Sequence, residues 1–168
     1  MTRREEIISA VQTHWPAALA AWSAHTLLRE PTVLVNATDE RRAGVVGQIA
    51  SIRLTDSTIF LNVPQIERLG LNGCELALLA HEVGHHIYVP GNLAEHTRLF
   101  VVLQRRLDGL PSRHVPMVAN LWADILINDR LQRETDIDIA EVYRRLRRAT
   151  KKRAAQEENH GATPPNLV

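Results

Sequence analysis

Cysteine is almost missing from this sequence, since Cys74 is the only one among its 168 residues. One cysteine excludes an internal disulfide and fits a reducing compartment, so we expect a cytoplasmic protein. The first residues contain no continuous apolar stretch long enough for a signal peptide. No later segment approaches the roughly 20 apolar residues that a membrane-spanning helix needs, so we expect neither secretion nor membrane insertion.

Net charge is also nearly missing, at +1 for the whole chain. There is thus no overall field that would favour nucleic acid, a membrane surface or an acidic substrate. A basic run stands near the end of the chain, and we expect it to be a solvated helix face. No aromatic residues interleave with it for base stacking. If the run has a partner, we therefore expect an acidic protein surface rather than nucleic acid. The run comprises Arg144, Arg145, Arg147, Arg148, Lys151, Lys152 and Arg153.

The length and composition are those of one soluble globular domain, with 45% apolar and 23% charged residues. We predict a single domain over residues 1–160 and a disordered tail over 161–168. The fold class is α+β, mainly helical, with one small sheet or hairpin before the central helix.

Apolar spacing and turn residues locate the elements. Pro16 is expected to open a second helix, Asn72 and Asn92 to cap helices with a glutamate three residues on, and Asp138 to cap the last one. The predicted helices cover residues 7–15, 16–28, 72–87, 92–107, 116–131 and 138 onward, the predicted strands cover 33–36, 45–54 and 58–63, and a charged loop covers 38–44.

The central helix carries the motif His81-Glu82-Val83-Gly84-His85. Residues four apart share one face of a helix, so the two histidines can present ring nitrogens to a single zinc ion. Glu82 can reach the water that zinc activates, which is where a general base belongs. Gly84 is expected to leave room at the ligand face, and the hairpin before the helix is typical of zincin peptidases.

A catalytic zinc usually takes three protein ligands, so a third is expected downstream. The long metzincin motif does not continue after His85, which excludes that subclass. Glu95, His96 and His114 are candidates without further support. Asp124 is favoured over them because it is acidic within an apolar helix.

Two amides flank Asp124 on the same line of that helix, at positions 120 and 128. Buried carboxylates need partners, and amides one turn away can orient this one. We therefore expect Asn120 and Asn128 to support the zinc ligands. A hydrogen-bonded core carboxylate or a salt bridge to a nearby arginine is the alternative interpretation of Asp124.

Two segments together resemble a known bacterial family. The segment from Leu78 to His85, Leu-Leu-Ala-His-Glu-Val-Gly-His, is followed by Asn-x-x-Ala-Asp-x-x-x-Asn from Asn120 to Asn128. This pair resembles the metallopeptidase domain that bacteria often encode beside von Willebrand factor A-like modules and MoxR-type AAA ATPases. The resemblance, over roughly residues 45–131, implies a zincin-like fold, an aspartate completing the zinc site, and a regulatory ATPase or von Willebrand factor A-like partner.

The predicted function is therefore hydrolysis of peptide bonds, by an endopeptidase rather than an exopeptidase. His86 is expected to cap the end of its helix, with polarisation of the substrate carbonyl as its alternative role. His114, Tyr143 and Tyr88 are further candidates for polarising that carbonyl, and sequence does not choose between them. Either strand of the hairpin could bind an extended peptide at its edge. The alternative function is a zinc-stabilised adaptor with weak or lost catalysis. An adaptor has no chemical need for Glu82, so this residue favours the enzyme.

Overall fold

The structure is a computed structural model that describes residues 2–107, 109 and 111–161, with side chains up to residue 156. Most of the predicted tail, 162–168, lies outside the described residues. The elements in chain order are α1 (Arg3–Ala20), β1 (Thr32–Leu34), α2 (Ala37–Ala43), β2 (Ala50–Arg53), β3 (Thr58–Asn62), α3 (Val63–Leu69), α4 (Glu75–Ile87), α5 (Leu93–Arg106), the 3₁₀ turn η1 (Ser112–His114), α6 (Val115–Glu134) and α7 (Ile139–Gly161). The predicted α+β class, mainly helical with a small sheet, is confirmed.

The first helix is continuous, and the prediction of a second helix opening at Pro16 was wrong. Pro16 lies inside α1, which ends at Ala20 rather than Leu28. A proline inside a helix removes one backbone hydrogen bond. Here the buried face of α1 packs on α4 and outweighs that loss. This face consists of Ile7, Val11, Trp15 and Ala18.

The sheet has three strands in the order β1-β3-β2. β1 is parallel to β3, and β2 and β3 form the predicted antiparallel hairpin. β2 covers only residues 50–53 rather than 45–54, because Gly47 has a φ of +75° and the chain turns there. β2 is an edge strand, so one side of its backbone is free of strand partners among the described residues.

The charged segment after β1 is a helix rather than the predicted loop. Asn36 caps α2 by accepting hydrogen bonds from the backbone N–H groups of Thr38 and Asp39, and Gly44 ends the helix in the left-handed conformation. The glutamate of this helix that points inward, Glu40, is buried and accepts a hydrogen bond from the backbone of Gly47.

α4 is the centre of the domain, since nine of its thirteen residues are buried. It begins at Glu75 rather than Asn72, so the predicted cap at Asn72 was wrong. Cys74 occupies the N-cap position without a side-chain cap, and the Glu75 carboxylate accepts a hydrogen bond from the backbone of Gly73 instead. The cap predicted at Asn92 is confirmed for α5.

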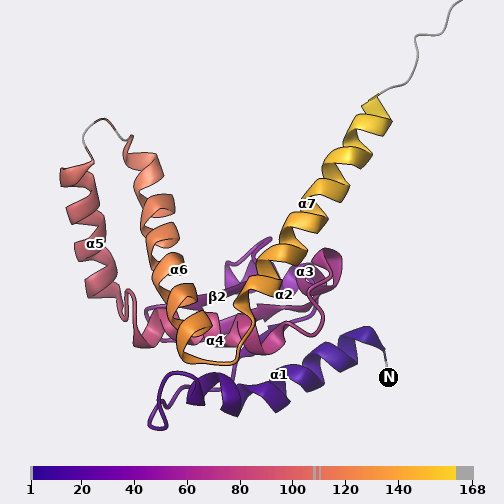
Figure 1. The fold of residues 1–168 in the computed structure, drawn as a ribbon, viewed down its shortest axis with the longest axis horizontal. Helices are drawn as coiled ribbons and strands as arrows, with labels where there is room; N and C mark the ends of the chain where they lie inside the picture. Colours follow the sequence, from indigo (N-terminus) through magenta and orange to yellow (C-terminus); the bar gives the residue numbers. More distant parts are fainter. Residues whose placement is uncertain (1, 108, 110, 162–168) are drawn as a thin grey trace, which may run out of the picture.

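Beyond α4, a hairpin of α5 and α6 and the single helix α7 rise from the same side of the body and diverge (Figure 1). The apolar residues predicted to form a wide face on α6 are only partly buried. Only every fourth residue is buried, from Val115 to Leu131, while Leu121, Trp122 and Ile125 are exposed. No described helix is long and apolar enough to cross a membrane.

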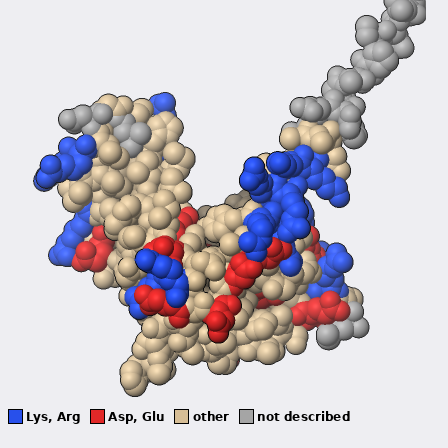
Figure 2. All heavy atoms as spheres, viewed as in Figure 1, with Lys and Arg blue, Asp and Glu red and all other residues tan. Residues whose placement is uncertain are grey.

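The basic run lies on α7, where Figure 2 shows its blue side chains above a red acidic band. Glu141 pairs with Arg144, Arg145 and Arg148, and Asp138 pairs with Arg144. Asp138 also caps the helix, as predicted, by accepting from the backbone of Glu141. Part of the run is therefore neutralised where α7 joins the body.

Candidate metal centre

Three potential metal ligands converge where α4 faces α6. Nε2 of His81 and Nε2 of His85 each lie 3.3 Å from Oδ1 of Asp124. The two imidazole rings stand edge to face, at an interplanar angle of 81°. One α4 turn places both histidines on the same face, and Asp124 projects from the middle of α6 opposite them.

The other ring nitrogen of each histidine is already engaged. Nδ1 of His85 lies 3.1 Å from the carbonyl oxygen of Val89, and Nδ1 of His81 lies 2.8 Å from Oδ1 of Asn128. Because both partners are acceptors, each Nδ1 donates a proton. A neutral imidazole then carries its lone pair on Nε2, the atom that faces Asp124.

Asp124 presents one supported and one unsupported oxygen. Oδ2 accepts a hydrogen bond of 3.0 Å from Nδ2 of Asn120. Oδ1 is buried and has no hydrogen-bond partner in the described part of the chain. Burial alone would raise the pKa of Asp124, whereas hydrogen bonds and positive charge from the His81 and His85 rings, where their Nε2 atoms are protonated, lower it. A zinc ion would take the place of those protons, and Oδ1 of Asp124 is aimed at both Nε2 atoms.

This arrangement fits a zinc ion. Two imidazole nitrogens and one carboxylate oxygen are ligands that catalytic zinc takes. With bonds of about 2.0–2.1 Å, the corners of a zinc tetrahedron are about 3.3 Å apart. The two observed separations between Nε2 and Oδ1 have this length. The buried, unpartnered Oδ1 of Asp124 also needs a positive partner.

Glu82 lies beside the ligand cluster, inside the same cavity. Its side chain is buried, and burial raises its pKa even though His81 and His85 act in the opposite direction. The backbone of Ile52 in β2 likewise acts to lower this pKa. Glu82 is thus held between α4 and the edge strand, close to the three converging atoms without being one of them.

The cavity has a volume of about 660 Å³ and is bounded by β2, α4, α5, α6 and α7. Its lining is mostly apolar, and no lysine or arginine of the described chain contributes to it. The apolar part of the lining consists of Ile49, Ala50, Ile52, Leu54, Leu78, Pro90, Leu99, Ala119, Ala123, Ile139, Val142 and Leu146.

Comparisons of this chain with known protein families, with curated proteins and with solved structures find no match. The resemblance to the bacterial metallopeptidase domain therefore stays a prediction.

The other candidates for a third ligand are not brought to the cluster. Glu95 is exposed and pairs with Arg98 on the same helix. His96 lines the cavity, but its ring stacks edge-on against Phe100, with centroids 4.4 Å apart. His114 is in η1 and does not belong to the described lining of the cavity.

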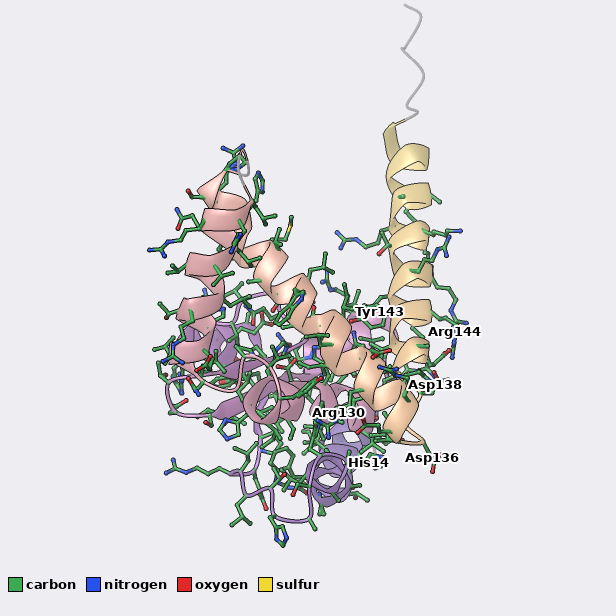
Figure 3. The ribbon with its side chains drawn as sticks, turned by 60° about the vertical axis from the view of Figure 1, so that its left-hand side comes forward. His14, Arg130, Asp136, Asp138, Tyr143 and Arg144 are labelled. Carbon is green, nitrogen blue, oxygen red and sulfur yellow. The ribbon has the colours of Figure 1, made fainter. Side chains whose placement is uncertain are left out.

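The structure also separates the residues predicted to polarise a substrate carbonyl. Tyr143 lines the cavity and accepts a hydrogen bond of 2.7 Å from Nδ2 of Asn128. Figure 3 labels it on the lower part of α7, beside α6. His86 turns away to Oγ of Ser57, at 3.0 Å, and Tyr88 packs against Trp22. Of the four candidates, only Tyr143 faces the cluster.

Gly84 has a different role from the predicted one. A Cβ atom at this position would lie 2.5 Å from Cζ2 of Trp22 and 2.8 Å from Cγ2 of Ile127. The glycine therefore makes room for the core rather than for a ligand. Sequence reasoning missed Trp22, whose Nε1 also donates to the carbonyl of Ala80, because no local pattern connects α4 to a residue near the end of α1.

Proposed function

We propose that this chain is a zinc-dependent endopeptidase of the HExxH type. The observation that carries the proposal is the convergence of three ligand atoms, with Nε2 of both histidines 3.3 Å from an unpartnered oxygen of Asp124. His81, His85 and Asp124 would hold the ion. Zinc with three protein ligands lowers the pKa of water to about 7 and polarises a carbonyl oxygen.

Glu82 acts as the general base in this proposal. Its carboxylate is buried in the cavity wall beside the ligands, and this burial raises its pKa, which makes it a stronger base than an exposed glutamate. A carboxylate at this place would accept a proton from the attacking water and return it to the leaving amine. Ile52 of β2 lines the same cavity as this carboxylate, on the side where a peptide would lie.

Tyr143 stabilises the substrate oxygen in this proposal. Its hydroxyl accepts a hydrogen bond from Asn128, so its own proton remains to be donated. A donor at the reacting carbonyl is worth several kcal/mol, about 2.7–4 where one has been removed from other enzymes. Asn128 therefore supports both a ligand histidine and this donor.

An internal peptide segment fits the cavity better than a chain end. The edge strand β2 lines the cavity and offers backbone groups to an extended chain. A terminal carboxylate would need a cation, and no described lysine or arginine lines the cavity. A terminal amine would need an acidic group, and the two acidic residues of the described lining, Glu82 and Asp124, serve proton transfer and the metal in this proposal. These features support an endopeptidase, and the single buried Cys74 supports a cytoplasmic one.

The test combines metal analysis with cleavage of a peptide library by wild type, Glu82→Gln and Asp124→Ala. We expect wild type to bind one zinc and cleave. Glu82→Gln should retain zinc and lose cleavage, whereas Asp124→Ala should lose zinc. Asp129→Ala, an exposed acid on the same helix, is the control and should behave as wild type. A zinc-loaded wild type that cleaves nothing would instead support the adaptor.

A further inference from the structure

An exposed apolar stripe runs along α6 beside the candidate site. It consists of Met117, Leu121 and Ile125, which are 63%, 56% and 57% exposed. These residues are four apart, so they follow one line along the helix. Large apolar side chains this exposed are costly to leave uncovered, and a contiguous set of them marks an interaction site.

The stripe adjoins the line of polar residues that serves the site. Each α-helical residue is rotated about 100° from the one before, so Leu121 lies about 100° from Asn120 and about 60° from Asp124. Asn120 and Asp124 both line the cavity. The stripe therefore lies next to the cavity-lining face of α6, with the polar Asn120 and Asp124 between it and the apolar lining residues Ala119 and Ala123.

We propose that the α6 stripe binds an apolar segment of the substrate polypeptide, next to the bond that is cut. This inference rests on the proposed function, and it names the substrate class: unfolded or extended chains that carry apolar side chains beyond the residues held in the cavity. The stripe consists of apolar side chains, and no described lysine or arginine lines the cavity. An extended segment with apolar side chains can therefore contact both.

The size of the stripe favours a peptide over a second copy of the chain. From Met117 to Ile125 the helix rises about 12 Å, which four residues of an extended chain would cover. A stable dimer buries about 800 Å² on each partner, which requires some 20–30 residues and so more than the four exposed large apolar side chains of α6, Trp122 included.

The test measures the binding of labelled peptides to zinc-loaded Glu82→Gln by fluorescence anisotropy, so that no cleavage is needed. One peptide has six residues with a Leu-rich centre. Two longer ones carry four extra residues at both ends, either Leu and Phe or Ser and Gln. The stripe variant adds Leu121→Gln and Ile125→Gln. The matched control adds Val102→Gln on α5, which is 54% exposed.

We expect the apolar extensions to tighten binding about tenfold over the short peptide, and the polar extensions to have no such effect. The stripe variant should lose this gain and still bind the short peptide normally, whereas the control should keep it. A gain that survives in the stripe variant, or polar extensions that bind equally well, would overturn the proposal. The proposal would also be overturned if light scattering showed that wild type is a dimer and that the stripe substitutions dissociate it.

Cleavage is measured separately with proteins that retain Glu82, with and without the stripe substitutions. If the binding pattern holds and no peptide is cut, the α6 stripe stands and the peptidase is wrong. If peptides are cut with kcat/KM values independent of the extensions and of the stripe substitutions, the peptidase stands and the stripe proposal is wrong.

Discussion

Nδ1 of His81 lies 2.8 Å from Oδ1 of Asn128, a residue 47 positions later in the chain. The same amide donates from Nδ2 to the hydroxyl of Tyr143. One side chain on α6 thus contacts both His81 on α4, a proposed zinc ligand, and Tyr143 on α7, a proposed donor to the substrate. Such supporting groups hold the orientation of the ring and the position of its proton, and so tune metal affinity.

Replacing Asn128 by alanine is expected to weaken zinc binding about 10–100-fold, because His81 loses the acceptor that keeps its proton on Nδ1. Competition with a chelator of known zinc affinity measures the change. Gln132→Ala removes an exposed amide from the same helix and is expected to leave zinc affinity unchanged. Equal affinities of the Asn128→Ala and Gln132→Ala variants would show that the amide does not support the site.

Local rules predicted the part of the site that lies within single helices. The spacing of His81 and His85, and the line from Asn120 through Asp124 to Asn128, follow from helix geometry alone. Sequence favoured Asp124 because a carboxylate in an apolar helix needs a partner, and the structure places it 3.3 Å from both histidines.

Contacts between distant elements were beyond such rules. The choice of Tyr143 over His86 and His114 depends on how α7 docks, which no local pattern encodes. The continuity of α1 through Pro16 likewise depends on packing against α4. On α6, apolar composition predicted burial for Leu121, but only the residues facing the body are covered.

Gly84→Ala is expected to destabilise the domain by about 1–3 kcal/mol, since the new methyl group would overlap Trp22 and Ile127. This loss exceeds the stabilisation of about 0.5–1 kcal/mol that alanine normally brings to a helix. Denaturant unfolding measures the change. Because Trp22 causes the closest overlap, Trp22→Phe should cost less in the Gly84→Ala background than in wild type.

The coupling between these two substitutions is expected to exceed about 0.5 kcal/mol, the size seen for residues in direct contact. Trp22→Phe alone also loses the hydrogen bond to the carbonyl of Ala80. The cost of this single substitution is measured separately and subtracted when the coupling energy is calculated. Strictly additive costs would mean that the core at Gly84 relaxes without involving Trp22.

Removal of metal is expected to lower the thermal stability of wild type. A ligand that binds only the folded state at 100 times its Kd stabilises it by about 2.7 kcal/mol. Zinc added to the metal-free protein should therefore raise its Tm, and a chelator should reverse the rise. Glu82→Gln should respond like wild type. Asp124→Ala should not respond, and a full response from it would exclude Asp124 as a ligand.

The acid stability of the domain is expected to depend on Glu141. Hydrogen bonds from Arg145 and Arg144, with the charge of Arg148 nearby, lower the pKa of this carboxyl from 4.5 to about 2. Arg145 also donates to the backbone carbonyl of Asn72, so the cluster ties α7 to the segment before α4. Glu141→Gln should therefore weaken the docking of α7.

The sign of the pH effect follows from the lowered pKa. A carboxyl with a lower pKa in the folded state stabilises the protein above its unfolded pKa, and this contribution is lost as the pH falls toward the folded value. The difference in Tm between wild type and Glu141→Gln should thus be full at pH 7, shrink below about pH 4.5 and nearly vanish at pH 2. Glu95→Gln, which removes one exposed ion pair with Arg98, is the control and should change Tm less at pH 7, because isolated surface pairs contribute little. A Glu141→Gln difference that stays constant from pH 7 to pH 2 would mean that the charge of this carboxylate does not stabilise the fold.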